Sequence, residues 1–240
     1  MGSSNVTDAG TAVHRLPGGR YRVECTWLGH IVFDGAITIS SEAKVTITVK
    51  VFYMEPKVVD SRGQAVEDTI VEATEPGTAS LLGSALTGAD GKTSLRLPIG
   101  NYDMEYTWRG RKVLSEEKIA LNADLARDVK VGVYYLKFTV KDDRLVPLEN
   151  ARVEVLVAKN VFESAMTGAS GEVEFRLPTA TYDAQIIWQT VEVGDVSTIL
   201  LDRDILSPVA ADVYYLTVLV KASDGTKLKG KGRISGQGLG

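Results

Sequence analysis

The side chains best suited to chemistry in this sequence lie near its beginning. Cys25 is the only cysteine, and His14 and His30 are the only histidines. A thiol and an imidazole can act as nucleophile and base, but no known catalytic or metal-binding motif surrounds these three residues. We therefore predict that Cys25 packs as a small apolar side chain between Tyr21 and Trp27, and that the protein is not an enzyme.

Two other groups of residues could bind ligands. Asp60, Asp90 and Asp224 lie in glycine-containing turns, where carboxylates can bind Ca²⁺. They lack the alternating oxygen spacing of a calcium loop, so turn formation is the simpler interpretation, and we expect neither a metal ion nor a cofactor. The three tryptophans could form a platform for sugars, but their regular positions favour packing in the core or between sheets.

The composition argues against several classes of protein and favours an all-β fold. The net charge of -4 argues against a nucleic-acid binder, and no apolar run approaches the roughly 18 residues that span a bilayer. Val is the most frequent apolar residue, and Thr and Ile are also common. These β-branched side chains suit a pleated sheet better than a helix, so we predict an all-β protein.

One sequence pattern occurs three times, about 80 residues apart. Each copy has Arg-Leu-Pro, then a Tyr, then a Trp six residues after that Tyr, which places both aromatic side chains on one face of a strand. The tripeptides begin at Arg15, Arg96 and Arg176, and the aromatic pairs are Tyr21 and Trp27, Tyr102 and Trp108, and Tyr182 and Trp188. This regular spacing indicates tandem structural repeats.

Side-chain phase indicates where one repeat gives way to the next. Apolar residues fall on odd numbers in 129–135 and on even numbers in 136–140, and one face of a strand cannot show both. The same reversal follows Tyr53 and Tyr215. We interpret each reversal as the chain leaving one sandwich core and entering the next, although a β-bulge would give the same pattern.

These boundaries divide the chain into four parts. Residues 54–135 and 136–215 are complete modules, and about seven short strands in each predict a β-sandwich whose last strand, in the second module, covers 211–215. Residues 216–240 match the first strands of a module, and residues 1–53 match the remainder. Together the two partial copies make almost one module.

The repeats resemble a known family. Residues 58–66 and 91–102 are similar to prealbumin-like sandwiches, which include carboxypeptidase regulatory-like domains and the B-type repeats of bacterial collagen adhesins. The resemblance implies Ig-like, seven-stranded modules of an extracellular or cell-surface structural protein, whose signal sequence is absent from this chain. Adhesin repeats also imply an isopeptide bond from a Lys, assisted by a buried Glu. Only Lys221 and Glu24 occupy both positions, and they lie in different partial modules.

Three arrangements of the partial modules are open: donation to the next subunit, closure of a ring within one chain, or a slice of a longer array. We favour donation, which predicts a head-to-tail homopolymer, a filament or pilus built by donor-strand complementation. The alternative is part of a repeat-array adhesin or stalk, possibly glycan-binding. The predicted subunit interface comprises Leu216, Val218, Val220, Lys221, Ile234 and Leu239 from one end and Val13, Leu16, Tyr21 and Val23 from the other.

Overall fold

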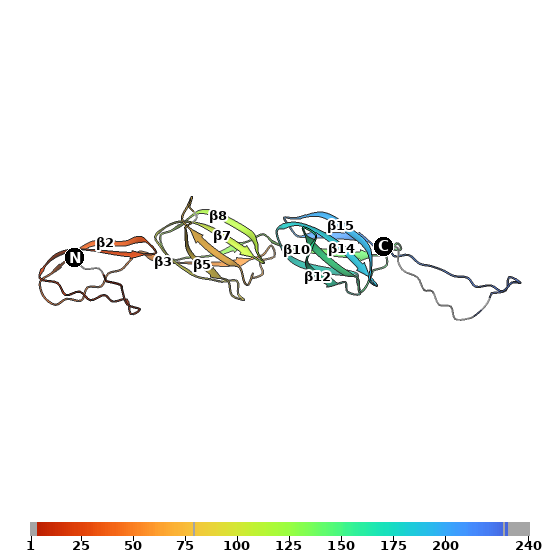
Figure 1. Cartoon of the computed structure of the whole chain (residues 1–240), viewed down its shortest axis with the longest axis horizontal. Coiled ribbons are helices and arrows are strands. Elements are labelled where there is room, and N and C mark those ends of the chain that lie inside the picture. The colour runs from red at the N-terminus through yellow and green to blue at the C-terminus, as the bar shows by residue number, and fades with distance from the viewer. Residues whose placement is uncertain (1–3, 79, 228, 230–240) are drawn as a thin grey trace.

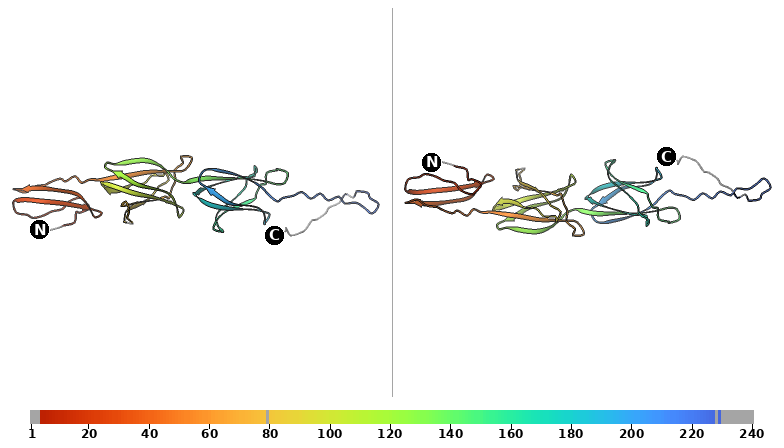
Figure 2. Two further views of the ribbon diagram at one scale, coloured as in Figure 1. Left: turned by 90° about the horizontal axis from the view of Figure 1, so that it is seen from above. Right: turned by 90° about the horizontal axis from the view of Figure 1, so that it is seen from below.

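The computed structural model describes residues 4–78, 80–227 and 229. Every regular element in these residues is a β-strand, which confirms the all-β prediction. Two sandwiches follow each other along one axis, with a two-stranded hairpin at one end and an extended C-terminal segment at the other (Figures 1 and 2). Over the same residues, no helix long and apolar enough to cross a membrane is present.

The two sandwiches have the same topology. The first contains β3 Val51–Val59, β4 Ile70–Thr74, β5 Leu81–Leu86, β6 Leu95–Pro98, β7 Gly100–Trp108, β8 Arg111–Leu121 and β9 Leu125–Lys130. The second contains β10 Val133–Lys141, β11 Arg152–Val157, β12 Asn160–Met166, β13 Glu172–Pro178, β14 Ala180–Trp188, β15 Val191–Leu201 and β16 Ile205–Ala210. Their three-stranded sheets have the orders β6-β3-β9 and β13-β10-β16, and their four-stranded sheets β5-β4-β7-β8 and β12-β11-β14-β15.

Strand β10 passes from one hydrophobic core to the next. Val133 is buried in the cluster of the first sandwich, whereas Leu136 is buried in the cluster of the second. The pairing of β10 with β13 continues from Val133 to Thr139 without a register shift, so the reversal of apolar phase is not a bulge. It arises because opposite faces of one strand serve two different cores.

The predicted last strand of the second module is wrong. The strand is Ile205–Ala210, and it pairs in parallel with β10 from Leu136 to Lys141. Residues 211–215 are not a strand but lead the chain out of the sandwich, where Ala211 still donates its N–H to the Lys141 carbonyl at 2.7 Å. Ala211 is buried and Val213 packs against the core of the second sandwich, whereas Tyr214 and Tyr215 are exposed.

The N-terminal hairpin is a partial copy of the same sandwich. It consists of β1 Gly19–Trp27 and β2 His30–Ile39, which correspond in the repeat to β7 and β8, and to β14 and β15. One hydrogen bond recurs in all three copies: a Tyr hydroxyl donates to the carbonyl of a Pro four residues earlier. The pairs are Tyr21 to Pro17 at 2.6 Å, Tyr102 to Pro98 at 2.6 Å and Tyr182 to Pro178 at 2.7 Å. Local structure is therefore the same in the hairpin and in the complete modules.

Candidate functional site: the module joints and the split module

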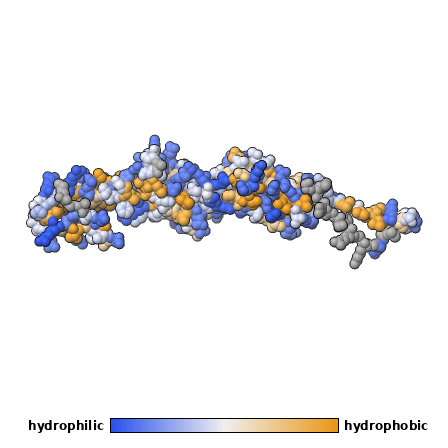
Figure 3. All heavy atoms as spheres, in the orientation of Figure 1, coloured by the Kyte–Doolittle hydropathy of each residue, from blue (hydrophilic) through white to orange (hydrophobic). Residues whose placement is uncertain are grey.

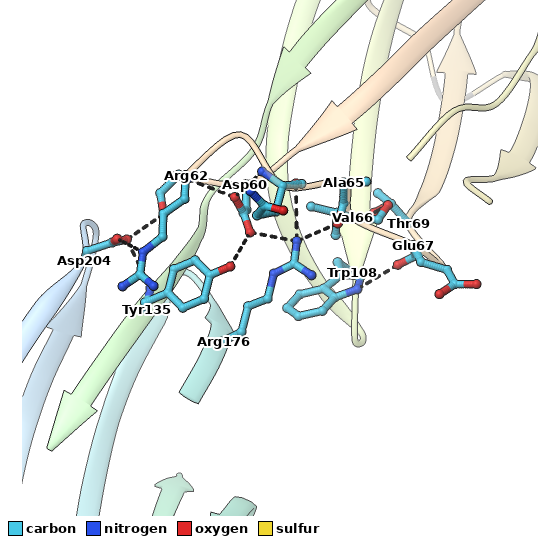
Figure 4. A network of polar contacts seen from close by, with 12 residues as sticks. Asp60, Arg62, Ala65, Val66, Glu67, Thr69, Trp108, Tyr135, Arg176 and Asp204 are labelled. Carbon is cyan, nitrogen blue, oxygen red and sulfur yellow. Dashed lines mark hydrogen bonds and ion pairs between the residues drawn. The ribbon is translucent and has the colours of Figure 1, made fainter. Parts of the chain in front are cut away.

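A buried carboxylate fastens the first sandwich to the second. Asp60, at the turn after β3, is 0% exposed, and its Oδ1 accepts the backbone N–H groups of Arg62 and Gln64, each at 2.9 Å. Its Oδ2 accepts the Tyr135 hydroxyl at 2.8 Å and lies 2.8 Å from Arg176 Nη2 (Figure 4). Because these partners compensate for its burial, one carboxylate ties the turn of the first module to the strands of the second.

Arg62 extends this joint to two further carboxylates. Its guanidinium contacts both oxygens of Glu174, at 2.8 and 3.0 Å, and Nε donates to Asp204 at 2.9 Å. The hydrogen bonds with Glu174 and then Asp204 raise the pKa of Arg62 above its ordinary value. Burial raises the pKa of Asp204, but hydrogen bonds from Ser61 and Arg62 outweigh it and leave that pKa below its usual range. The guanidinium also lies 3.5 Å from the centre of the Tyr135 ring.

Trp108 lies at the other side of this joint. Its indole Nε1 donates to the Glu67 carbonyl at 3.0 Å, and Arg176 lies 5.7 Å from its ring centre. Trp188 makes the equivalent bond to Glu149 at 3.3 Å. Both tryptophans are half-buried and pack against the edge of a core. They are therefore neither fully buried core residues nor an exposed platform for sugars. Trp27 is 42% exposed and has no such acceptor among the described residues.

The hairpin is attached to the first sandwich by backbone bonds like those between the two sandwiches. At the first joint, Lys50 donates its N–H to the Val32 carbonyl, and the Lys50 carbonyl accepts the N–H of Ile99. At the joint between the two sandwiches, Gly132 plays the same part: it donates its N–H to the Val113 carbonyl and accepts the N–H of Thr179. Arg96 lies 5.6 Å from the ring centre of Trp27, as Arg176 lies from Trp108, and Asp124 accepts the Tyr53 N–H at 2.8 Å. The hairpin thus occupies the place of a module.

Among the described residues, no further strands complete a sandwich around the hairpin. Tyr21, Val23 and Cys25 share one face of β1 and are only half-buried. Their counterparts in the second module, which are Tyr182, Ala184 and Ile186, are at most 1% exposed. Residues 11–17 and 43–48, which match the strands flanking β10, are in no strand. The predicted interface residues Val13 and Leu16 lie there, 92% and 40% exposed.

The C-terminal segment, described for residues 216–227 and 229, has the turn that follows the first strand of a module, whereas residues 216–220 are in no strand. Lys221 pairs with Lys227 as Val59 pairs with Ala65 and Lys141 with Pro147. Ala222 donates to Thr226 at 2.8 Å, and Gly225, at a φ of 85°, closes the turn. Its apolar side chains are uncovered (Figure 3). Leu216, Val218 and Val220 are 71%, 59% and 53% exposed, whereas the equivalent Leu136, Phe138 and Val140 are 0% exposed.

The N-terminal hairpin and the described part of the C-terminal segment, which carry the predicted interface residues, lie at opposite ends of the molecule (Figures 1 and 2). Within one chain the partial modules therefore do not meet, so the closed ring is not found. Lys221 and Glu24, the residue that would assist its isopeptide bond, are likewise apart. Ile234 and Leu239 lie outside the described residues.

The residues considered for chemistry serve local structure. Asp60, Asp90 and Asp224 each accept a backbone N–H from two residues further on, which is a turn-forming role. His30 lies 3.0 Å from Glu75 and His14 hydrogen-bonds with Ser4 at 2.9 Å. In the residues that the structure covers, neither histidine is bonded to the half-buried thiol of Cys25.

Sequence reasoning missed the charged joint. Its signal was present: Asp-x-Arg occurs at 60–62 and again at 142–144, and the Arg of the repeated Arg-Leu-Pro completes the pair at Arg176. The C-terminal segment departs from this pattern, with Ala222 in place of the Asp and Asp224 in place of the Arg.

No protein-family model and no curated protein matches this chain. Among solved structures, it is similar to the Bacillus anthracis TIE protein, with 17% identity and a TM-score of 0.30 over 86% of this chain and 44% of that one. It is also similar to a Streptococcal ancillary pilin, with 13% identity and a TM-score of 0.34 over 82% and 76% of the two chains. It is also similar to the shaft pilin SpaA from Lactobacillus rhamnosus GG, with 11% identity and a TM-score of 0.37 over 68% of this chain and 100% of that one. The chain thus spans less than half of the TIE protein, and its sandwich architecture is established by its own sheets.

Proposed function

We propose that the protein is the structural subunit of an extracellular filament or pilus. Each subunit would complete the N-terminal half-module of the next with its own C-terminal segment, by donor-strand complementation. One observation carries this proposal: the hairpin and the C-terminal segment hold complementary parts of a sandwich that the chain contains twice in complete form, and both parts expose core side chains.

The donated strand would remove a large apolar surface from water. Leu216, Val218 and Val220 share one face, and burying all three would contribute roughly 5–8 kcal/mol before the entropy cost of association. They would cover the half-buried face of Tyr21, Val23 and Cys25. The equivalent positions of both complete modules are buried, so the completed hairpin module should bury these three side chains as well.

Backbone hydrogen bonds would set the register of the donated strand. In the second module, β10 pairs with β13 on one side and β16 on the other. The matching stretches of the N-terminal part, 11–17 and 43–48, are in no strand, so the donated strand could form ladder hydrogen bonds with both of them. Thr11 would first have to give up its bonds to Thr7. A slip of one residue would turn Thr217 and Leu219 inward instead of the three apolar side chains named above.

A contact of this kind uses different surfaces on the two subunits, so it generates an open filament unless its rotation closes. The alternative is part of a longer repeat-array adhesin or stalk, possibly glycan-binding. The glycan-binding form of this alternative has little support, because Trp108 and Trp188 are half-buried and their N–H groups are bonded to backbone carbonyls.

The proposal is tested by sedimentation velocity over a concentration series, with negative-stain microscopy of the same samples. The chain should form larger species as its concentration rises, and Val218→Asp should keep it monomeric by placing a carboxylate in the groove. Leu200→Asp is a matched control, because Leu200 is 58% exposed on β15, away from both partial modules. This control should assemble normally. An unmodified chain that stays monomeric at every concentration would overturn the proposal.

A further inference from the structure

The C-terminal end of the second sandwich carries half of a charged joint. Asp142 is 5% exposed, its Oδ1 accepts the N–H groups of Arg144 and Val146, and its Oδ2 accepts the Tyr215 hydroxyl at 2.7 Å. The Arg144 guanidinium lies 3.9 Å from the centre of the Tyr215 ring. Asp60, Arg62 and Tyr135 make the same set of contacts between the two complete modules.

The other half of the joint is missing at this end. Between the complete modules, Asp60 also contacts Arg176, and Arg62 contacts Asp204. Within the part of the chain that the structure describes, no ion pair reaches Asp142 or Arg144. A carboxylate and a guanidinium are therefore held in position without their opposite charges.

The repeat identifies the residues that would supply those charges. Arg15 begins the first Arg-Leu-Pro, so it is the counterpart of Arg176. Glu42 lies nine residues before the Val-aromatic-Tyr motif at 51–53, and Asp204 lies nine residues before the same motif at 213–215. Both Arg15 and Glu42 are exposed and flank the N-terminal hairpin, which lies at the end of the molecule opposite to the C-terminal segment (Figure 1).

The backbone hydrogen bonds support the same correspondence between the two joints. Asp212 donates its N–H to the Val193 carbonyl at 2.7 Å, as Gly132 does to the Val113 carbonyl. In the joint between the complete modules, the Gly132 carbonyl then accepts the N–H of the residue after Arg-Leu-Pro. The equivalent pair would join the Asp212 carbonyl to the N–H of Gly18 in the neighbouring subunit.

We infer that each joint between subunits is locked by two ion pairs, Arg15 with Asp142 of the preceding subunit and Glu42 with Arg144 of that subunit. This inference rests on the proposed head-to-tail assembly. The lock supplies direction and register, because the two pairs have opposite polarity and a reversed or shifted contact would bring like charges together. The equivalent of Glu174 is Val13, so Arg144 has one carboxylate partner where Arg62 has two.

The test uses charge reversal in the full chain. Arg144→Glu and Glu42→Arg should each weaken association at least about tenfold at low salt, because each puts like charges in contact. The double variant, Arg144→Glu with Glu42→Arg, should recover most of the loss. Arg15→Glu should weaken association in the same way, and it tests the pair of Arg15 with Asp142. Asp142 is left intact because its Oδ1 also forms the turn.

Glu117→Arg is the matched control for Glu42→Arg, since it makes the same change of charge at an exposed position on β8. It should associate like the unmodified chain, and circular dichroism should show every variant folded. If the unmodified chain assembles and Arg144→Glu or Glu42→Arg matches the control, the lock is refuted while the filament proposal stands. A double variant that recovers nothing would refute the pairing of Glu42 with Arg144. Failure of the unmodified chain to assemble would instead refute the proposed function itself.

Discussion

The second sandwich and the N-terminal hairpin have the same local structure and very different burial. Tyr182 and Tyr21 donate to their prolines at 2.7 and 2.6 Å, but Tyr182 is fully buried and Tyr21 is not. Burial raises the pKa of Tyr182 to about 12. The comparison shows that the hairpin takes its conformation from nearby residues, whereas burial of its apolar face needs strands that the hairpin does not supply.

The largest expected effect comes from two equivalent positions, Phe138 and Val218. Phe138→Ala should lower the free energy of unfolding of the second module by about 3–5 kcal/mol, because it leaves a cavity in a packed core. Val218→Ala should change the unfolding of an unassembled subunit by less than about 0.5 kcal/mol, because its side chain is already in water. Urea titration at low protein concentration measures both. Equal losses would mean that Val218 is packed within its own subunit.

An intermediate effect is expected at the joint between the complete modules. Asp60→Ala should lower the free energy of unfolding by about 1–3 kcal/mol, because Tyr135 and Arg176 lose a buried acceptor. Asp90→Ala removes a similar turn acceptor from an exposed site with no partner across the joint, and should cost less. Urea titration of the two variants would contradict the role of Asp60 if their losses were the same.

The smallest expected effect concerns the single thiol. Cys25 is half-buried in the hairpin, but the equivalent Tyr106 and Ile186 are 0% exposed. Assembly should therefore slow the reaction of the Cys25 thiol with a thiol reagent at least about tenfold, because a buried thiol reacts only when the structure around it opens locally. Val218→Asp, which should not assemble, should keep the fast rate. A thiol that reacts equally fast in filaments would show that the groove stays open.

The sequence predicted the features that depend on neighbouring residues. Alternating apolar residues and recurring turn residues indicated the strands and the repeat, and the phase change at Tyr135 coincides with the passage of β10 between two cores. The last strand of the module was misplaced because Ile205–Ala210 is defined by its parallel pairing with β10, about 70 residues earlier. Such a partner cannot be read from local alternation.

The charged joint was missed for a similar reason. Asp60 and Tyr135 are 75 residues apart in the chain, and neither looks unusual in its own segment. Only the alignment of the repeats places Asp-x-Arg, Tyr and the Arg of Arg-Leu-Pro side by side. The tryptophans were expected in the core or between sheets, but at Trp108 the indole is shared between a core edge and the joint.

The third turn has Ala222 and Asp224 where the other two turns have Asp and Arg, and this difference has a mechanical consequence. In a filament assembled as proposed, two of every three joints contain the carboxylate and the guanidinium that clamp successive modules. The third joint, between a completed hairpin module and the first sandwich, has neither group in place. Bending and twisting should concentrate there, so the filament would behave as stiff three-module rods linked by evenly spaced compliant hinges, able to yield to shear without losing its strand pairing.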